Sequence, residues 1–103
     1  MDFKVIWSDA AIADLRDICS YIAAHNPEAA YRMGRGILDH VRILASFPFI
    51  GPAYPRGAQG SLREIVFRSY RIFYDVSEKA RTVEILHIWH GARNEPEFKS
   101  PRE

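Results

Sequence analysis

The sequence predicts an α+β domain in which a helical hairpin covers one face of a mostly antiparallel sheet, in the order β-α-α-β-β-β. Two stretches with apolar residues at helical spacing lie in the first half of the chain, and three runs rich in Val, Ile, Phe and Tyr lie in the second. A length of 103 residues suits a single domain. We expect residues 1–93 to form this domain and residues 94–103 to be a loose C-terminal tail.

The first helix is predicted to follow a short strand over residues 3–7. Ser8 is a good N-cap residue because its hydroxyl can accept a hydrogen bond from the first turn. The helix presents one apolar face at offsets of four, three and four, made of Ala11, Leu15, Ile18 and Ile22.

The second helix is predicted to begin at the sequence Asn26-Pro27-Glu28. Asn26 caps it, Pro27 occupies its first position, and the charge of Glu28 complements the helix dipole. It should end near Ser46, ahead of a Phe-Pro pair. The link between the helices is so short that they should form an antiparallel hairpin. The apolar stripe of this helix comprises Ala30, Met33, Ile37, Val41 and Leu44.

The three C-terminal runs predict strands over residues 62–67, 70–76 and 82–89, joined by links of hairpin length. We expect a register that places opposite charges across from each other. The expected pairs are Phe67 with Arg71, Arg63 with Asp75, Val76 with Thr82, and Arg71 with His87.

That register assigns a set of side chains to each face of the sheet. The face under the helices would carry Leu62, Val66, Ile72, Val76, Leu86 and Ile88. The helix-free face would carry Arg63, Phe67, Arg71, Phe73, His87 and Trp89. An aromatic and basic face is typical of an interface with protein or nucleic acid. Exposed strands also have this composition without any partner, and a slip of one residue would exchange the faces.

The composition excludes several classes of protein. A formal net charge of +1 argues against a uniformly basic nucleic-acid binder. The lone Cys19 rules out zinc sites built on several thiolates, suits a reducing cytoplasm, and fits a packing role. His87 and His90 should point to opposite faces of a strand, which argues against a metal between them. We see neither a signal peptide nor a membrane span, and we expect a cytoplasmic protein without metal or cofactor.

An ordered series of short motifs then runs through residues 3–93. It comprises Trp7-Ser8 to Ala11, Asp14-Leu15, Ile18 with Tyr21-Ile22, Asn26-Pro27-Glu28-Ala29-Ala30, Leu44-Ala45-Ser46-Phe47-Pro48 before Gly51, Ser69-Tyr70-Arg71-Ile72-Phe73-Tyr74, and Ile85 to Arg93. Together these motifs resemble the RelE/ParE superfamily of type II toxins. The resemblance implies the same β-α-α-β-β-β fold and a cognate antitoxin that holds the toxin inactive. It also implies one of two targets: RelE-like members cleave mRNA on the ribosome, and ParE-like members poison DNA gyrase.

The residues of this chain match the two branches unequally. Arg71 matches the arginine of the family's Tyr-Arg-x-x-Tyr strand, and Arg93 matches the arginine after the last strand. Ribonuclease members place lysines at strand positions that are Leu62 and Glu64 here. No tyrosine follows Arg93, and the nearest aromatic residue is Phe98.

The resemblance is therefore greater to the ParE branch, which the run from His90 to Arg93 also favours. We expect a toxin that inhibits DNA gyrase. The expected target-binding residues are Arg63, Arg71, His90 and Arg93. The antitoxin would dock on the helical hairpin as an amphipathic segment, with Tyr21, Ile22 and Met33 as lining residues unless these belong to the core.

Two alternatives stay open. A ribosome-dependent mRNA endonuclease needs an acid, a base and cations for the developing phosphorane charge. Arg63, Arg71 and Arg93 would supply charge, and His87 or His90 the acid or base. The named catalytic set of that reading is Arg71, His87 and Arg93. The second alternative is a non-toxic binding module of the same fold.

Overall fold

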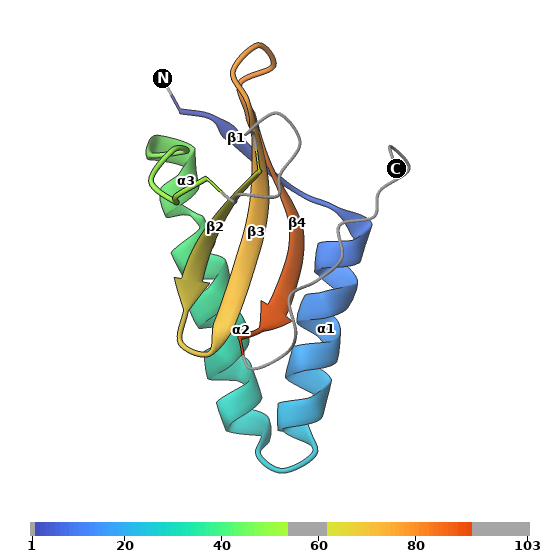
Figure 1. The fold of residues 1–103 in the computed structure, drawn as a ribbon. Coiled ribbons are helices and arrows are strands. Elements are labelled where there is room, and N and C mark those ends of the chain that lie inside the picture. The colour runs from blue at the N-terminus through green and yellow to red at the C-terminus, as the bar shows by residue number, and fades with distance from the viewer. Residues whose placement is uncertain (1, 54–61, 92–103) are drawn as a thin grey trace.

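This computed structural model describes residues 2–53 and 62–91 and confirms the predicted fold class and element order (Figure 1). The second helix, predicted to continue to near Ser46, ends at Val41, and Ile43–Ser46 form a separate one-turn helix. The elements are β1 (Lys4–Trp7), α1 (Asp9–Ala23), α2 (Pro27–Val41), α3 (Ile43–Ser46), β2 (Leu62–Phe67), β3 (Tyr70–Ser77) and β4 (Thr82–His90).

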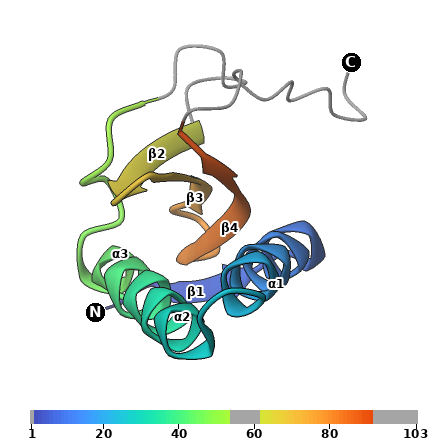
Figure 2. The same cartoon turned by 90° about the horizontal axis from the view of Figure 1, so that it is seen from below.

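The four strands form one mixed sheet in the order β1-β4-β3-β2. β1 runs parallel to β4, and the other two pairings are antiparallel. Figure 2 shows α1 and α2 side by side on the same face of this sheet. β2 and β1 therefore form its two edges, and the opposite face, here called the helix-free face, carries no helix of the described residues.

Both helix starts have the caps that the sequence predicts. The Oγ of Ser8 accepts the N–H of Ala11 at 3.0 Å and donates to the carbonyl of Leu86 at 3.1 Å, so it also ties α1 to β4. The Oδ1 of Asn26 accepts the N–H of Ala29 at 3.0 Å. A cap of this kind contributes about 1 kcal/mol to helix stability.

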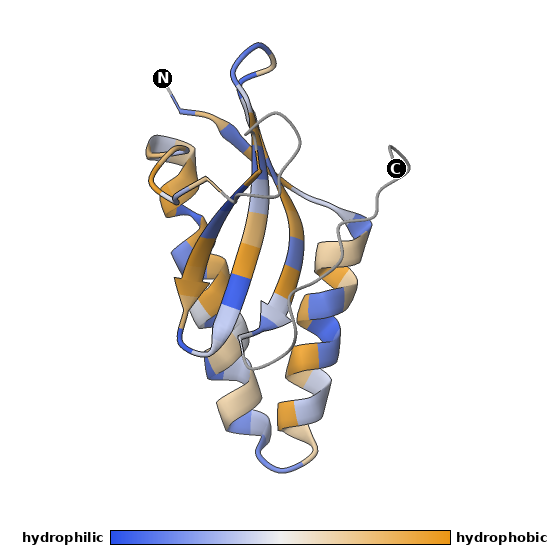
Figure 3. Ribbon diagram, in the orientation of Figure 1, coloured by the Kyte–Doolittle hydropathy of each residue, from blue (hydrophilic) through white to orange (hydrophobic). Residues whose placement is uncertain are grey.

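The core lies between the helical hairpin and the sheet, where the predicted helix stripes meet the strands. In Figure 3 the strands and the helices both alternate hydrophobic and hydrophilic residues along their length, as expected of elements with one buried face. The buried cluster consists of Ala11, Ile37, Val41, Leu44, Ile72, Tyr74, Val83, Ile85 and Ile88. Leu15, Ile18 and Met33 pack against it from the helices.

The predicted register between β2 and β3 is wrong by one residue. Phe67 pairs with Tyr70 rather than Arg71, and Arg63 pairs with Tyr74. The physical reason is the turn: a two-residue link closes directly between Phe67 and Tyr70, with Arg68 at a φ of 54°. The geometry of a tight turn thus sets the register, and charge pairing across the strands does not.

The register between β3 and β4 is also wrong. Val76 pairs with Val83 rather than Thr82, and Arg71 pairs with Trp89 rather than His87. The ladder shifts between Phe73 and Tyr74, as it does at a β-bulge. A bulge adds one residue to one strand and so changes which of its side chains face the core.

These shifts correct the assignment of side chains to the two faces. Phe67 lies under the helices, against Gly36, where an added Cβ would sit 2.6 Å from its ring. Val66 is 56% exposed and is the cross-strand partner of Arg71. Leu62 and Leu86 leave the helix side and form a separate apolar cluster with Phe73 and Trp89. The expected placements of Ile72, Val76 and Ile88 under the helices are confirmed.

None of the helices within residues 2–53 and 62–91 is long and apolar enough to cross a membrane.

Candidate functional site

Arg71 lies on the helix-free face, as expected, and is bound there by Glu64. Its Nε lies 2.5 Å from Oε2 of Glu64, and its Nη2 lies 3.2 Å from Oε1. The side chains of Arg71 and Glu64 are only 24% and 19% exposed. The guanidinium carbon also stacks 5.1 Å from the centre of the Phe73 ring. Arg71 is therefore held from two sides in one orientation.

This bidentate pair compensates the charge of Arg71. A forked arginine–carboxylate pair is one of the stronger polar contacts in proteins, and an incoming phosphate would have to displace the carboxylate. On the described part of the helix-free face, Arg71 is thus one half of an ion pair and not a single positive charge.

An apolar patch adjoins the pair on the same face. Glu64 is the cross-strand partner of Phe73, and Arg71 that of Trp89. The patch consists of Leu62, Phe73, Leu86 and Trp89; Leu62 and Phe73 are buried, and Leu86 and Trp89 are partly exposed. Trp89 is the aromatic residue of this patch that keeps some exposure, and an aromatic residue beside an arginine is typical of the centre of a protein interface.

Arg63 is not on this face, which corrects the expectation that it works beside Arg71. As the cross-strand partner of Tyr74, it lies on the helix side of β2. Its Nη1 donates to the carbonyl of Gly51 at 2.7 Å and to that of Phe49 at 3.4 Å, and its guanidinium stacks 4.9 Å from the Phe49 ring. Arg63 thereby fastens the segment after α3 to the edge of the sheet.

Gly51 is held in the same place by a second contact. Its N–H donates to the buried hydroxyl of Tyr74 at 3.0 Å. A Cβ at Gly51 would lie 2.4 Å from the carbonyl oxygen of Glu64, so only glycine fits against the strand there. Burial raises the pKa of Tyr74, although the Gly51 hydrogen bond and the charge of Arg63 act in the opposite direction.

His90 lies in a cleft between α1 and the ends of β3 and β4. Its ring packs edge-on against Tyr70 at 5.3 Å between centres. The cleft has a volume of about 640 Å³ and is lined by Asp14, Asp17, Ile18, Tyr21, Tyr70, Ile88 and His90. His90 and Arg71 therefore face different surroundings, and Arg93, the last residue of the expected target-binding set, lies outside the described residues.

His87 is tied to the first helix by a contact that the sequence does not reveal. Its Nδ1 lies 3.1 Å from Oδ2 of Asp14, and the same oxygen accepts the N–H of Ile88 at 2.9 Å. Asp14 thus joins α1 to β4 and fixes the orientation of the imidazole. His87 lies next to the irregularity of the β3–β4 ladder, where Phe73 pairs with His87 and Tyr74 with Ile85.

The three residues expected to bind the antitoxin have different surroundings. Tyr21 is 76% exposed and lines the cleft beside His90. Ile22 is half-buried, and Met33 packs against the core, which is the alternative considered for it. A common docking surface for all three would have to wrap around the hairpin.

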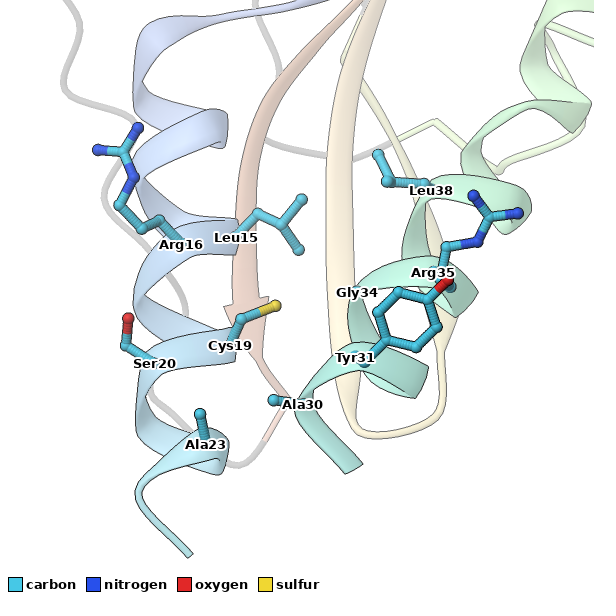
Figure 4. Close-up of a pocket in the computed structure, with 10 residues that line it drawn as sticks. All are labelled: Leu15, Arg16, Cys19, Ser20, Ala23, Ala30, Tyr31, Gly34, Arg35 and Leu38. Carbon is cyan, nitrogen blue, oxygen red and sulfur yellow. The ribbon is translucent and has the colours of Figure 1, made fainter. Parts of the chain in front are cut away.

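A second concave surface lies on the side of the helical hairpin that faces away from the sheet (Figure 4). We call it the outer groove; its volume is about 490 Å³. Cys19 points from α1 toward α2 in the groove, and burial raises the pKa of its thiol. The lining residues are Leu15, Arg16, Cys19, Ser20 and Ala23 from α1, and Ala30, Tyr31, Gly34, Arg35 and Leu38 from α2.

The sequence does contain a signal for the outer groove. Small residues recur four positions apart, as Cys19 and Ala23 on α1 and Ala30 and Gly34 on α2. A four-residue spacing places both members of a pair on one side of a helix. Among residues 2–53 and 62–91, no group of three or more His, Cys, Asp or Glu side chains is arranged to hold a metal ion.

Comparisons with known proteins agree with this geometry. Residues 5–95 match the family described as the ParE toxin of the type II toxin–antitoxin system parDE. The chain is 37% identical over 91 residues to the toxin RelE2 of Caulobacter vibrioides, covering 87% of this chain and 97% of that toxin.

Two solved structures share the fold. One is the chromosomal ParDE system from P. aeruginosa, with a TM-score of 0.71, 22% identity, and coverage of 85% of this chain and 95% of that one. The other is the isolated E. coli RelE toxin, with a TM-score of 0.62, 18% identity, and coverage of 90% and 88%. The names of these proteins span both branches of the superfamily.

Proposed function

This chain belongs to the ParE toxin family of type II toxin–antitoxin systems, and we propose that it inhibits DNA gyrase by binding it through the helix-free face of the sheet. In this proposal a cognate antitoxin neutralises the toxin, and both proteins work in the cytoplasm. The toxin acts by contact alone, so it needs no general base, metal or cofactor.

One observation carries the choice of target. Arg71 is engaged by Glu64 and lies beside the apolar patch. By the resemblance drawn from the sequence, ribonuclease members carry a lysine at the position of Glu64. A compensated arginine that stacks on the buried Phe73 and lies beside the partly exposed Trp89 suits recognition of a protein surface. It suits poorly the binding of a phosphorane, whose negative charge needs uncompensated cations.

The test is supercoiling by purified gyrase in the presence of the toxin. We expect the wild type to inhibit and Arg71→Ala to weaken inhibition by about tenfold or more, as truncation of an interface arginine does. Arg32→Ala is the matched control, because the Arg32 side chain is exposed on α2 and contacts Glu28 only at 4.0 Å. Melting curves of each variant exclude unfolding as the cause. Full supercoiling at saturating wild-type toxin would overturn the proposal.

The mRNA endonuclease reading keeps one observation in its favour. Asp14 orients the ring of His87, and this is how a carboxylate prepares an imidazole for general base catalysis. That reading predicts cuts in ribosome-bound mRNA that disappear in His87→Gln and decrease in Asp14→Asn. Intact mRNA after incubation with translating ribosomes and wild-type toxin would contradict it.

A further inference from the structure

We propose that the target-binding surface of the helix-free face continues over the edge of β2 into an apolar pocket, where it holds an extended segment of the target protein by one apolar side chain. The pocket, here called the edge pocket, has a volume of about 440 Å³. It lies between the outer edge of β2, the end of α2, and α3 with the segment that follows it. The inference rests on the proposed function and deepens it, because it names the shape and chemistry of the part of gyrase that binds.

A row of side chains leads from the proposed site to this pocket. Trp89, Arg71 and Val66 are successive cross-strand partners on β4, β3 and β2, so they lie in line across the sheet. Val66 ends the row at the edge of the sheet, is 56% exposed, and also lines the edge pocket. A partner that covers Arg71 therefore reaches the pocket by crossing a single strand.

The backbone of Val66 offers the hydrogen bonds of an unpaired sheet edge. Backbone groups of an antiparallel edge strand point alternately toward the neighbouring strand and away from it. The N–H of Glu64 points away, since it donates to the carbonyl of Pro52 at 3.2 Å, so the N–H and carbonyl of Val66, two residues on, point away too. Within residues 2–53 and 62–91, no other residue bonds to these two groups. An extended segment could bond to both and so continue the sheet.

The walls of the edge pocket select an apolar side chain. Ile43 and Ile50 line it and are 39% and 55% exposed, so a partner would remove apolar surface from water there. Among the described residues that line it, Glu64 is the only carboxylate, and Arg71 already compensates its charge. A charged side chain of the partner would lose its hydration in this pocket without gaining an opposite charge.

Ile50 is held in its exposed position by the chain around it. Arg63 donates to the carbonyls of Phe49 and Gly51, which are the residues on either side of Ile50. The N–H of Ile50 itself donates to the carbonyl of Phe47 at 3.2 Å. A segment that is fixed before binding loses little conformational entropy when a partner covers it. These backbone contacts therefore prepare Ile50 for contact with another protein.

The chemistry of the pocket argues for a protein rather than for the DNA on which gyrase acts. Most contacts to DNA go to phosphate and sugar, and they come from cationic side chains and other hydrogen-bond donors. No lysine or arginine is among the described residues that line the edge pocket. An apolar side chain of a protein is the better match.

The segment after α3 argues against a second copy of this chain as the occupant. Antiparallel pairing of two β2 edges about Val66 would place Arg68 of one copy opposite Glu64 of the other. Pro52 already bonds to the backbone of Glu64 there, so the two chains would compete for one position. A segment of another protein can bond to Val66 and turn away before it reaches Pro52.

The test measures the affinity of the toxin for purified gyrase with two isoleucine variants. Ile50→Ser removes an apolar wall of the pocket. Ile12→Ser is the matched control, because Ile12 is 41% exposed on α1 and does not line the pocket. We expect Ile50→Ser to weaken binding by about tenfold or more and Ile12→Ser by less than about twofold, with melting curves to show that both are folded. Equal affinities of Ile50→Ser and wild type would overturn the proposal.

The backbone contact has its own pair of variants at Val66. Val66→Ala shortens the side chain and keeps the N–H, whereas Val66→Pro also removes the N–H. Proline fits an edge strand at a position where the N–H points away from the sheet. We expect Val66→Pro to bind gyrase about fivefold more weakly than Val66→Ala, as the loss of one hydrogen bond predicts. Equal affinities of the two variants would overturn the extended mode of binding.

Supercoiling assays on the same samples separate this inference from the proposed function. Inhibition by wild type that Ile50→Ser retains in full rejects only the edge pocket. A wild type that neither binds nor inhibits gyrase rejects the proposed function, and with it the target named here. Two further results would overturn the inference by naming another occupant. One is binding of DNA without gyrase that Ile50→Ser abolishes, and the other is a wild-type dimer that Ile50→Ser converts to monomers in sedimentation equilibrium.

Discussion

The helix-free face of the sheet and the outer groove of the hairpin are both partly apolar and bordered by arginine, but they hold that arginine in different ways. On the sheet, Arg71 is forked onto Glu64 and is less than a quarter exposed. At the groove, Arg35 is 53% exposed and touches Asp39 at the limit of an ion pair. A partly buried, paired arginine such as Arg71 should contribute to the free energy of unfolding, whereas an exposed one such as Arg35 should contribute very little. The two arginine environments therefore predict that substitutions around Arg71 lower the free energy of unfolding and that substitutions in the outer groove do not.

The largest difference should appear at two glycines. Gly51→Ala would place a Cβ 2.4 Å from the backbone oxygen of Glu64, and a backbone clash cannot be relieved by rotating a side chain. We expect a loss of about 3 kcal/mol in the free energy of unfolding, measured by urea denaturation. In the groove, Gly34→Ala meets only the sulfur of Cys19 at 3.2 Å and gains helix propensity, so it should be within about 1 kcal/mol of wild type. Equal losses would show that the groove is packed as rigidly as the sheet edge.

The second difference concerns the two ion pairs. Glu64→Ala leaves Arg71 partly buried without its carboxylate and should lower the free energy of unfolding by about 2 kcal/mol. Asp39→Ala removes an exposed partner of Arg35 and should cost less than about 0.5 kcal/mol. A double-mutant cycle of Arg71→Ala and Glu64→Ala would measure the coupling directly. A coupling near zero would mean that Arg71 does not belong to the fold.

The third prediction concerns Tyr74, which fastens Gly51 to the sheet. Tyr74→Phe removes the acceptor of the Gly51 N–H and should cost about 1 kcal/mol near neutral pH. The pKa of Tyr74 is raised by burial, so the unfolded chain loses this proton first as the pH rises past about 10. The free energy of unfolding of the wild type should therefore fall above that pH, and that of Tyr74→Phe should fall less. Cys19 contributes equally to both proteins, so the comparison isolates Tyr74.

The sequence predicts the elements of this fold well because their signals are local. Ser8 and Asn26 form the caps that their positions predict, and the helix stripes through Ile37 and Val41 reach the core. The faces of the strands are predicted less well. Their assignment depends on a two-residue turn and a shifted ladder, and one residue of slip moved Phe67 to the opposite face.

The candidate site follows the same pattern. Arg71 is found because its strand motif resembles that of a known family, but its partner Glu64 is found only from the correct register. The Asp14–His87 contact joins residues 73 positions apart, beyond the reach of any local pattern. The four-residue spacing of small residues is a signal from which a close approach of two helices could have been predicted, although nothing in it distinguishes a groove from a buried contact.

The smallest expected effect tests whether the groove arginines are dispensable for folding. Arg16→Glu with Arg35→Glu should change the free energy of unfolding by no more than about 0.5 kcal/mol, because exposed charges with weak partners contribute little. Within the described residues, the ion pair of Arg35 with Asp39 is the one contact that the change reverses to repulsion. Thermal melts at low and high salt would measure it, since added salt should remove most of any difference. A loss of 2 kcal/mol that persists in high salt would mean that these arginines hold the hairpin together, and the contrast with Arg71 would disappear. A small, salt-sensitive loss would leave the groove arginines available for a partner.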